Sequence, residues 1–93
     1  MGNEIVIAFS STNYAIQAET VILEANVPVK VMPLPASIRA GCGICLRISP
    51  EDRETVERLM REHNIPIQQM YMRKTENGKS IYTELKKGDS QDG

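Results

Sequence analysis

The chain has 93 residues, enough for one domain with a modest core and too few for separate cofactor-binding and substrate domains. It carries 11 basic and 12 acidic residues, a formal net charge of -1, and its aromatic residues are one Phe and three Tyr. This composition provides neither a basic surface nor stacking groups, so we expect no binding to nucleic acid or to an anionic membrane. We predict a single domain over residues 1–85 and a disordered polar tail over residues 86–93.

The first third of the chain predicts a strand, a helix and a second strand. Residues 4–9 form a short apolar run rich in β-branched side chains, which is typical of a buried central strand. Residues 10–13 offer several helix caps, and apolar residues then recur at helical spacing to about Asn26. Residues 29–32 alternate as a second strand, which Pro33 ends.

The rest of the chain predicts a strand, a helix and a hairpin. Residues 44–49 alternate, which puts Cys45 on the face opposite the isoleucines of that strand. Ser49 and Pro50 are a typical helix start, and the apolar face of the helix that follows runs to His63. Residues 67–73 predict a fourth strand. The pair Asn77-Gly78, at positions 77–78, predicts a hairpin whose edge strand returns over residues 79–84.

This order of elements is typical of an α+β ferredoxin-like βαββαβ sandwich, with two helices on one face of an antiparallel sheet, plus a C-terminal hairpin extension. The helix-free sheet face would be less polar than a free surface usually is, so a homodimer or a partner protein could cover it. The residues expected on this open face are Val6, Ala8, Met32, Cys45 and Met70. Because Glu4 interrupts the first apolar run, we find no signal peptide or membrane span and expect a cytoplasmic protein.

The chemistry of the chain centres on Cys42, which lies in a Pro- and Gly-punctuated loop over residues 33–43. Gly41 and Gly43 flank it without side chains, so we expect an accessible and reactive thiol. The predicted topology brings this loop beside the start of the first helix, where free N–H groups favour a thiolate, a persulfide or a bound anion. The residues assigned to anion binding are Ser11, Thr12, Asn13, Arg39, Gly41 and Gly43. His63 is a candidate proton shuttle at the same end, with helix capping as its alternative.

Cys45 stands three residues after Cys42, which in a reducing compartment favours redox, carrier or metal chemistry over a structural disulfide. It is either a second thiol or a small buried strand residue. Two Cys and one His are too few for a closed zinc site within one chain, and we expect no metal and no cofactor. A thioredoxin-like oxidoreductase is disfavoured, because it would need a helix where the residues after Cys45 predict a strand.

Five stretches carry a resemblance to a known family: Phe9 to Ala15, Ala18 with Glu19, Val29 to Pro35, Ile38, and Gly41 to Gly43. Over roughly the first 70 residues the chain resembles the selenium or sulfur carrier protein-like family, a group of small bacterial domains. Cys45 departs from the pattern, which has a small apolar residue there. The resemblance implies that Cys42 holds sulfur or selenium as a persulfide or selenosulfide, received from a donor protein and passed to an acceptor protein.

Such a protein is a carrier or accessory protein rather than a stand-alone enzyme. The residues leave open an alternative, in which the chain is a small ligand-binding or regulatory interaction domain. An anionic metabolite would then bind at the Cys42 loop and the start of the first helix, and the thiol would be incidental.

Overall fold

The computed structural model describes residues 3–39 and 41–85. Its elements are β1 (Glu4–Ala8), α1 (Thr12–Glu24), β2 (Lys30–Pro33), β3 (Ile44–Ile48), a 3-10 turn η1 (Pro50–Asp52), α2 (Arg53–Glu62), β4 (Gln69–Glu76) and β5 (Lys79–Leu85). The strands form one sheet in the order β2-β3-β1-β4-β5, and neighbouring strands are antiparallel. The predicted α+β class is confirmed, with two helices and five antiparallel strands. The fifth strand makes the order different from that of a simple βαββαβ unit.

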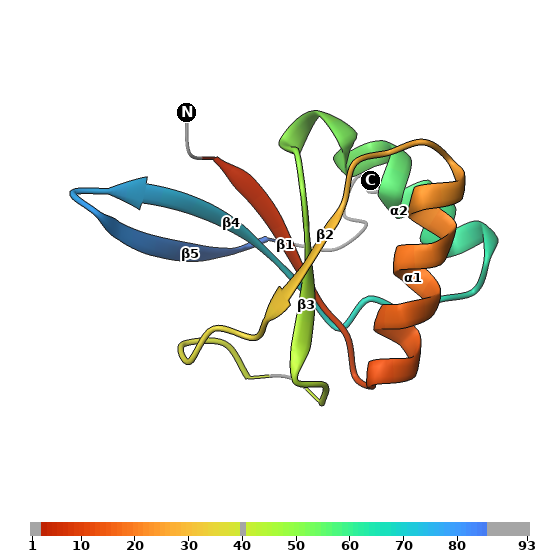
Figure 1. Cartoon of the computed structure of the whole chain (residues 1–93), viewed down its shortest axis with the longest axis horizontal. Helices are drawn as coiled ribbons and strands as arrows, with labels where there is room; N and C mark the ends of the chain where they lie inside the picture. Colours follow the sequence, from red (N-terminus) through yellow and green to blue (C-terminus); the bar gives the residue numbers. More distant parts are fainter. Residues whose placement is uncertain (1–2, 40, 86–93) are drawn as a thin grey trace.

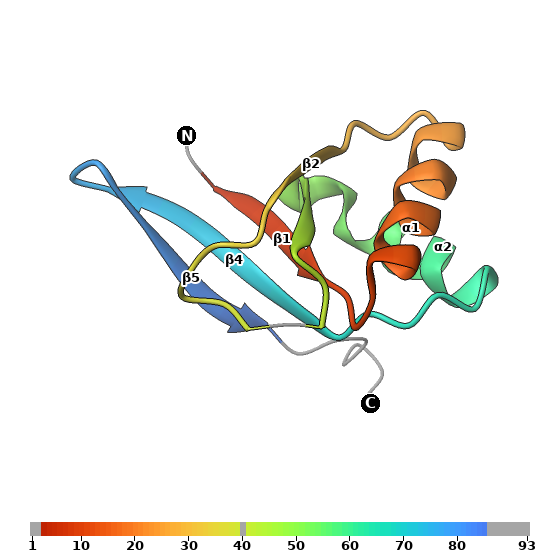
Figure 2. The ribbon, with the colours of Figure 1, turned by 60° about the horizontal axis from the view of Figure 1, so that its bottom comes forward.

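The two faces of the sheet pack differently. Side chains alternate along β1, so Ile5 and Ile7 belong to the core that the two helices cover. Both helices lie on this side of the sheet (Figure 1). Val6 and Ala8 point to the other side, where the β2–β3 loop supplies Ile38 to the same cluster. In Figure 2 this loop crosses in front of β4 and β5, and Tyr71 of β4 and Tyr82 of β5 pack against the same cluster.

The prediction of an open apolar face is therefore wrong. Val6, Ala8 and Cys45 are all 0% exposed, because residues of this same chain cover them. Met70 is also misplaced in that prediction, since its side chain packs in the core on the helix side. The long loop between two short strands returns over the sheet, and its apolar residues fill the face that the helices leave uncovered.

Helix α1 begins at a cap that the sequence indicated. Ser11 is the N-cap, and its Oγ accepts a hydrogen bond from the backbone N–H of Tyr14 at 3.2 Å. Ala15, Ala18 and Ile22 form the buried stripe. The helix ends at Glu24, two residues before the predicted end, because Asn26 adopts a left-handed conformation with φ of 62°.

Helix α2 differs from its prediction at its start and in the placement of His63. Ser49 makes no side-chain capping bond, and a 3-10 turn precedes the α-helix. At the other end Asn64 is left-handed with φ of 56°, and the Ile65 N–H donates to the Met60 carbonyl at 2.9 Å. This closing turn makes His63 the exposed C-cap residue. The prediction that His63 lines the apolar face of the helix is therefore wrong.

The bounds of strands β2, β4 and β5 also differ slightly from the predicted ones. β2 includes Pro33, which pairs with Ile44, and this is tolerated because β2 is an edge strand. β4 begins two residues later than predicted and continues to Glu76. Asn77 and Gly78 have φ of 52° and 78°, as a two-residue hairpin turn requires. The hairpin extension is thus present, and it projects away from the helices (Figure 1).

Candidate functional site

Three segments that are far apart in sequence meet at one end of the sheet. A Cβ atom added to Gly41 would lie 2.0 Å from the Ser10 carbonyl oxygen, so the two backbones are in direct contact. The Gly41 N–H donates to Gln68 Oε1 at 3.2 Å, and the Gln68 N–H donates to the Ala8 carbonyl at 3.0 Å. The predicted meeting of the Cys42 loop with the turn before the first helix is therefore present, and Gln68 links both to the segment after α2.

The loop that carries Cys42 is also closed at its base. The Leu34 N–H donates to the Gly43 carbonyl at 3.0 Å, and this bond continues the β2–β3 pairing by one step. Within the loop, the Ile38 N–H donates to the Pro35 carbonyl at 3.0 Å and forms a turn. The Cys42 segment is thus held between a strand pair on one side and the Gly41–Gln68 bond on the other.

The Cys42 thiol points inward. It is 4% exposed and belongs to the apolar cluster on the helix side of the sheet. Its Sγ donates to the Ile44 carbonyl at 2.8 Å. The expectation of an accessible thiol is therefore corrected: the flanking glycines leave the backbone bare, but the loop turns the side chain between them into the core. The closed loop therefore leaves almost none of Cys42 exposed to a reaction partner.

Cys45 lies on the other side of the sheet. It is 0% exposed, packs with Val6, Ala8 and Ile38, and its Sγ is 3.8 Å from the Pro33 carbonyl oxygen. Burial raises the pKa of the Cys45 thiol to about 11, the nearby Cys42 adds to the rise, and Arg47 opposes it. Cys45 is therefore protonated near neutral pH.

The two cysteines are both free and pack in separate clusters. The predicted placement of Cys45 opposite the isoleucines of its strand is confirmed, because Leu46 and Ile48 lie in the helix-side cluster. The burial expected of a small strand residue is present as well. A role for Cys45 as a second thiol stays a prediction.

The residues assigned to anion binding differ in exposure and in hydrogen bonding. The Ser11 hydroxyl is already engaged as the helix cap, whereas Thr12 and Asn13 are exposed in the first turn of α1. This turn contains no acidic residue, and the first N–H groups of a helix have no acceptor within it. Arg39 is exposed in the loop, and the space around Gly43 is open. Anion binding here stays a prediction.

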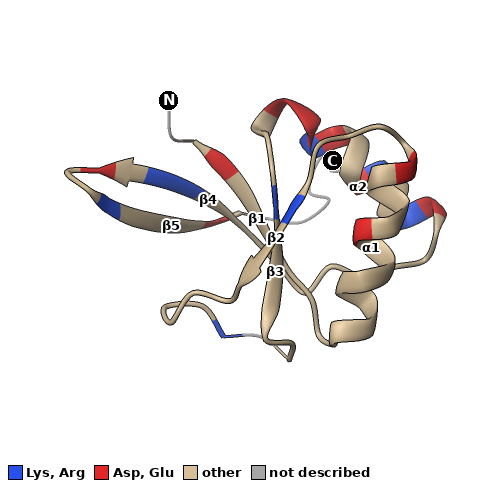
Figure 3. Cartoon of the chain, in the orientation of Figure 1, with Lys and Arg blue, Asp and Glu red and all other residues tan. Residues whose placement is uncertain are grey.

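Charge is sparse at this end of the molecule. Residues 9–14 and 64–69 carry no charged side chain, and Arg39 is the one charged residue in the segment 33–46. Figure 3 shows the contrast with α2 and with the β4–β5 hairpin, where both signs of charge are frequent. Arg39 and the start of α1 are thus positive groups at this end, and the carboxylate of Glu84, which accepts from Gln69 Nε2, is a negative one.

His63 lies at the C-cap of α2. Its backbone N–H donates to the Leu59 carbonyl at 3.0 Å, which is a capping role, and its side chain is exposed at the end of α2. No hydrogen bond joins its imidazole to the residues that the structure describes. The role of proton shuttle stays a prediction.

Sequence reasoning missed Gln68 and the carbonyl of Ile44, which are the hydrogen-bond partners of the Cys42 segment. No pattern in the sequence marks either of them, because one is the first of two adjacent glutamines before a strand and the other is a backbone group. Within residues 3–39 and 41–85, no group of three His, Cys, Asp or Glu is placed to hold a metal ion. Neither helix in this part of the chain is long and apolar enough to span a membrane.

Fold and site together define a small α+β domain with a glycine-flanked thiol held inside a closed loop. The chain belongs to the family described as "Putative Se/S carrier protein-like", whose model matches residues 4–72. The matched region runs from β1 into β4, so it contains both helices and the whole Cys42 loop and stops before the hairpin turn. Neither a curated protein nor a solved structure matches the chain.

Proposed function

We propose that the protein carries one atom of sulfur or selenium on Cys42 and delivers it to an acceptor protein. Membership of the carrier-like family carries this proposal, since the matched region includes the Cys42 loop in full. The enclosure of the thiol gives it further support. A persulfide that is buried is shielded from other thiols, and a loop without regular secondary structure can open without breaking the strand ladder.

Loading and delivery are two thiol exchange reactions. In loading, the Cys42 thiolate attacks the outer sulfur of a donor persulfide, a new S–S bond forms, and the donor leaves as a thiolate. In delivery, an acceptor thiolate attacks the outer atom on Cys42, and Cys42 is released as a thiolate. Selenium follows the same scheme when the donor carries it as an outer selenium atom. Neither step needs an external oxidant or reductant, because one bond to the outer atom breaks as another forms.

Both steps require a conformational change. With the thiol 4% exposed and bonded to the Ile44 carbonyl, no attacking group can align with the sulfur in the closed loop. Opening separates Gly41 from Ser10 and breaks the Gly41–Gln68 hydrogen bond. A hydrogen bond contributes about 0.5–1.5 kcal/mol, so a docked partner can supply the free energy that opening needs.

The proposal is tested by the intact mass of the protein after incubation with a sulfane-sulfur or perselenide donor. The parent and the Cys45→Ser variant are expected to gain one sulfur or selenium atom that a thiol reductant removes. Cys42→Ser is expected to gain none. A Cys42→Ser variant that loads as well as the parent would end the carrier proposal, and so would loss of two hydrogen atoms that requires both cysteines, because that is an internal disulfide.

The second candidate is a domain that binds an anionic metabolite, which is favoured by the exposed Thr12 and Asn13 in a helix turn without acids. Titration with inorganic phosphate, followed by NMR of these two residues, distinguishes it. If the protein binds an anionic metabolite, phosphate binding should be saturable, and Cys42→Ser should leave it unchanged.

The carrier proposal also includes a fold, a cellular location and a docking surface. The placement of the first four strands as β2-β3-β1-β4, with both helices on one face, supports a ferredoxin-like unit with a hairpin added. A cytoplasmic location suits free thiols. Donor and acceptor proteins would dock near the loop rather than on the covered face of the sheet.

A further inference from the structure

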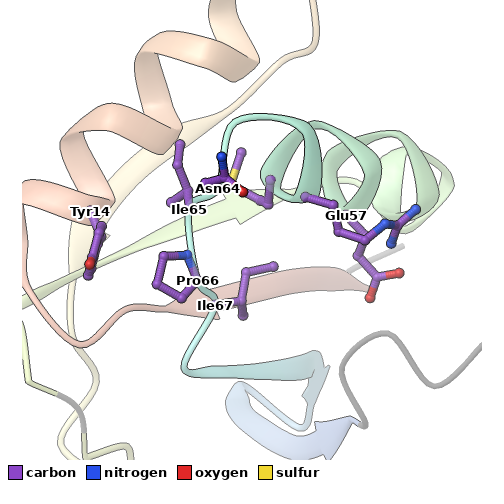
Figure 4. A pocket seen from close by; sticks show the side chains of 8 residues that line it. Tyr14, Glu57, Asn64, Ile65, Pro66 and Ile67 are labelled. Carbon is purple, nitrogen blue, oxygen red and sulfur yellow. The ribbon is translucent and has the colours of Figure 1, made fainter.

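A second concave site, which Cys42 does not line, lies between the first turn of α1 and the C-terminal half of α2. It is a groove of about 640 Å³, within the usual range of about 300–1,000 Å³ for small-molecule sites. Figure 4 shows it extending from Tyr14 on α1, past Ile65 and Pro66, to Glu57 on α2. No residue that we assigned to the thiol chemistry lines this groove.

The floor of the groove is apolar and preformed. Met60, Ile65, Pro66 and Ile67 line it, and Met60 and Ile65 are anchored in the main core. The left-handed Asn64 and the bond from the Ile65 N–H to the Met60 carbonyl fix the chain directly after α2. Pro66 then has a fixed φ and restricts the backbone of Ile65 before it. Because the helix end and the proline set its shape, the groove needs no rearrangement to accept a ligand.

Two charged side chains line the groove at its α2 end, and one of them has an ion-pair partner among the described residues. The buried Glu57 accepts from Arg53 Nε at 3.3 Å, so its negative charge is already matched. Arg61, one turn further along α2, also lines the groove and is exposed. Its guanidinium forms no ion pair or hydrogen bond with the part of the chain that the structure describes. The groove therefore has an apolar floor and, at its edge, the guanidinium of Arg61 without an ion-pair partner in the described part of the chain.

We infer that this groove binds a small apolar carboxylic acid. The carboxylate pairs with the guanidinium of Arg61, a geometry in which two parallel hydrogen bonds can form. The hydrocarbon part lies on Pro66 and Ile67, and the ring of Tyr14 bounds the opposite end. The charge of Glu57 does not oppose this binding, since Arg53 neutralises it. The inference stands apart from the carrier function, because it uses no atom of Cys42.

The test uses the full chain and octanoate as the probe, with binding followed by NMR shifts and by calorimetry. Arg58 supplies the matched control: it is on the same helix, pairs with Glu62 at 3.6 Å and does not line the groove. Arg61→Gln is expected to weaken octanoate binding about three- to tenfold, and Arg58→Gln to leave it unchanged. In the parent, octanol is expected to bind more weakly than octanoate by a similar factor.

A third variant tests the apolar floor. Ile67→Ala is expected to weaken octanoate and octanol alike, and its thermal melt is compared with that of the parent so that unfolding is not read as lost binding. Absence of saturable octanoate binding, equal affinities for acid and alcohol, or equal losses in Arg61→Gln and Arg58→Gln would each overturn the inference. Shifts confined to Thr12 and Asn13 would overturn it too, because they place the acid at the start of α1.

Discussion

Replacing Gly41 by alanine tests the backbone contact that closes the Cys42 loop. The new Cβ would lie 2.0 Å from the Ser10 carbonyl oxygen and 2.8 Å from the Ser10 carbonyl carbon, and both are backbone atoms that cannot rotate away. The loop must therefore move off Ser10 and give up the hydrogen bond to Gln68. Overpacking by a methyl group costs roughly 1–3 kcal/mol, so we expect a loss of about 2 kcal/mol in the free energy of unfolding.

Gly43→Ala is the matched control, because no heavy atom lies within 4 Å of its added Cβ and its φ is not in the left-handed region. It is expected to leave stability unchanged or to raise it by about 0.4–1 kcal/mol through the unfolded chain. Urea unfolding and thermal melts measure both variants, with a drop in Tm of about 8–16 °C expected for Gly41→Ala. Alkylation of Cys42 in native conditions should also become faster in that variant. Equal stability of the two variants, or unchanged alkylation of Cys42, would refute the close contact.

Three other predictions concern the sheet. The pKa of Cys45 is about 11 in the folded protein against an ordinary 9.0. The protonated Cys45 thiol therefore contributes fully to the free energy of unfolding below pH 9.0, and this contribution is lost as pH rises through about 11. Urea unfolding at a series of pH values should show this loss in the parent and not in Cys45→Ala. Glu4 bridges Arg47, at 3.2 Å, and Arg73, so Glu4→Gln should cost about 1 kcal/mol in urea unfolding, and an unchanged midpoint would contradict the bridge. Gly78→Ala places a side chain at φ of 78° and should cost about 1 kcal/mol in thermal melts, whereas no change would argue against the turn.

Local patterns were enough to predict the elements of this fold. The apolar run before Ser10, the Ser11 cap and the left-handed pair at Asn77 and Gly78 each act within a few residues, so the sequence contains their whole cause. The start of α2 was less predictable. Ser49 and Pro50 are compatible both with an α-helix and with a 3-10 turn. In the structure the chain forms a 3-10 turn before the α-helix begins.

The site was predictable in its location but not in its burial. Topology alone brought the Cys42 loop to the turn that precedes α1, as the contact of Gly41 with Ser10 shows. The inward direction of the thiol depends on that contact and on a bond to Gln68, which is 27 residues away in sequence. No local pattern of glycines reports such long-range packing. The covered sheet face escaped prediction for the same reason, since Ile38 reaches it from a loop.

The separation of the two cysteines has a consequence for a carrier. If Cys45 could reach a persulfide on Cys42, it would form an internal disulfide and discharge the outer atom as hydrogen sulfide or hydrogen selenide. In the closed loop the two side chains belong to clusters on opposite sides of the sheet, and burial keeps the Cys45 thiol protonated, which separates it from this reaction. Under the proposed carrier function, the closed loop would therefore keep the outer atom away from Cys45, and delivery would depend on a thiol from another molecule.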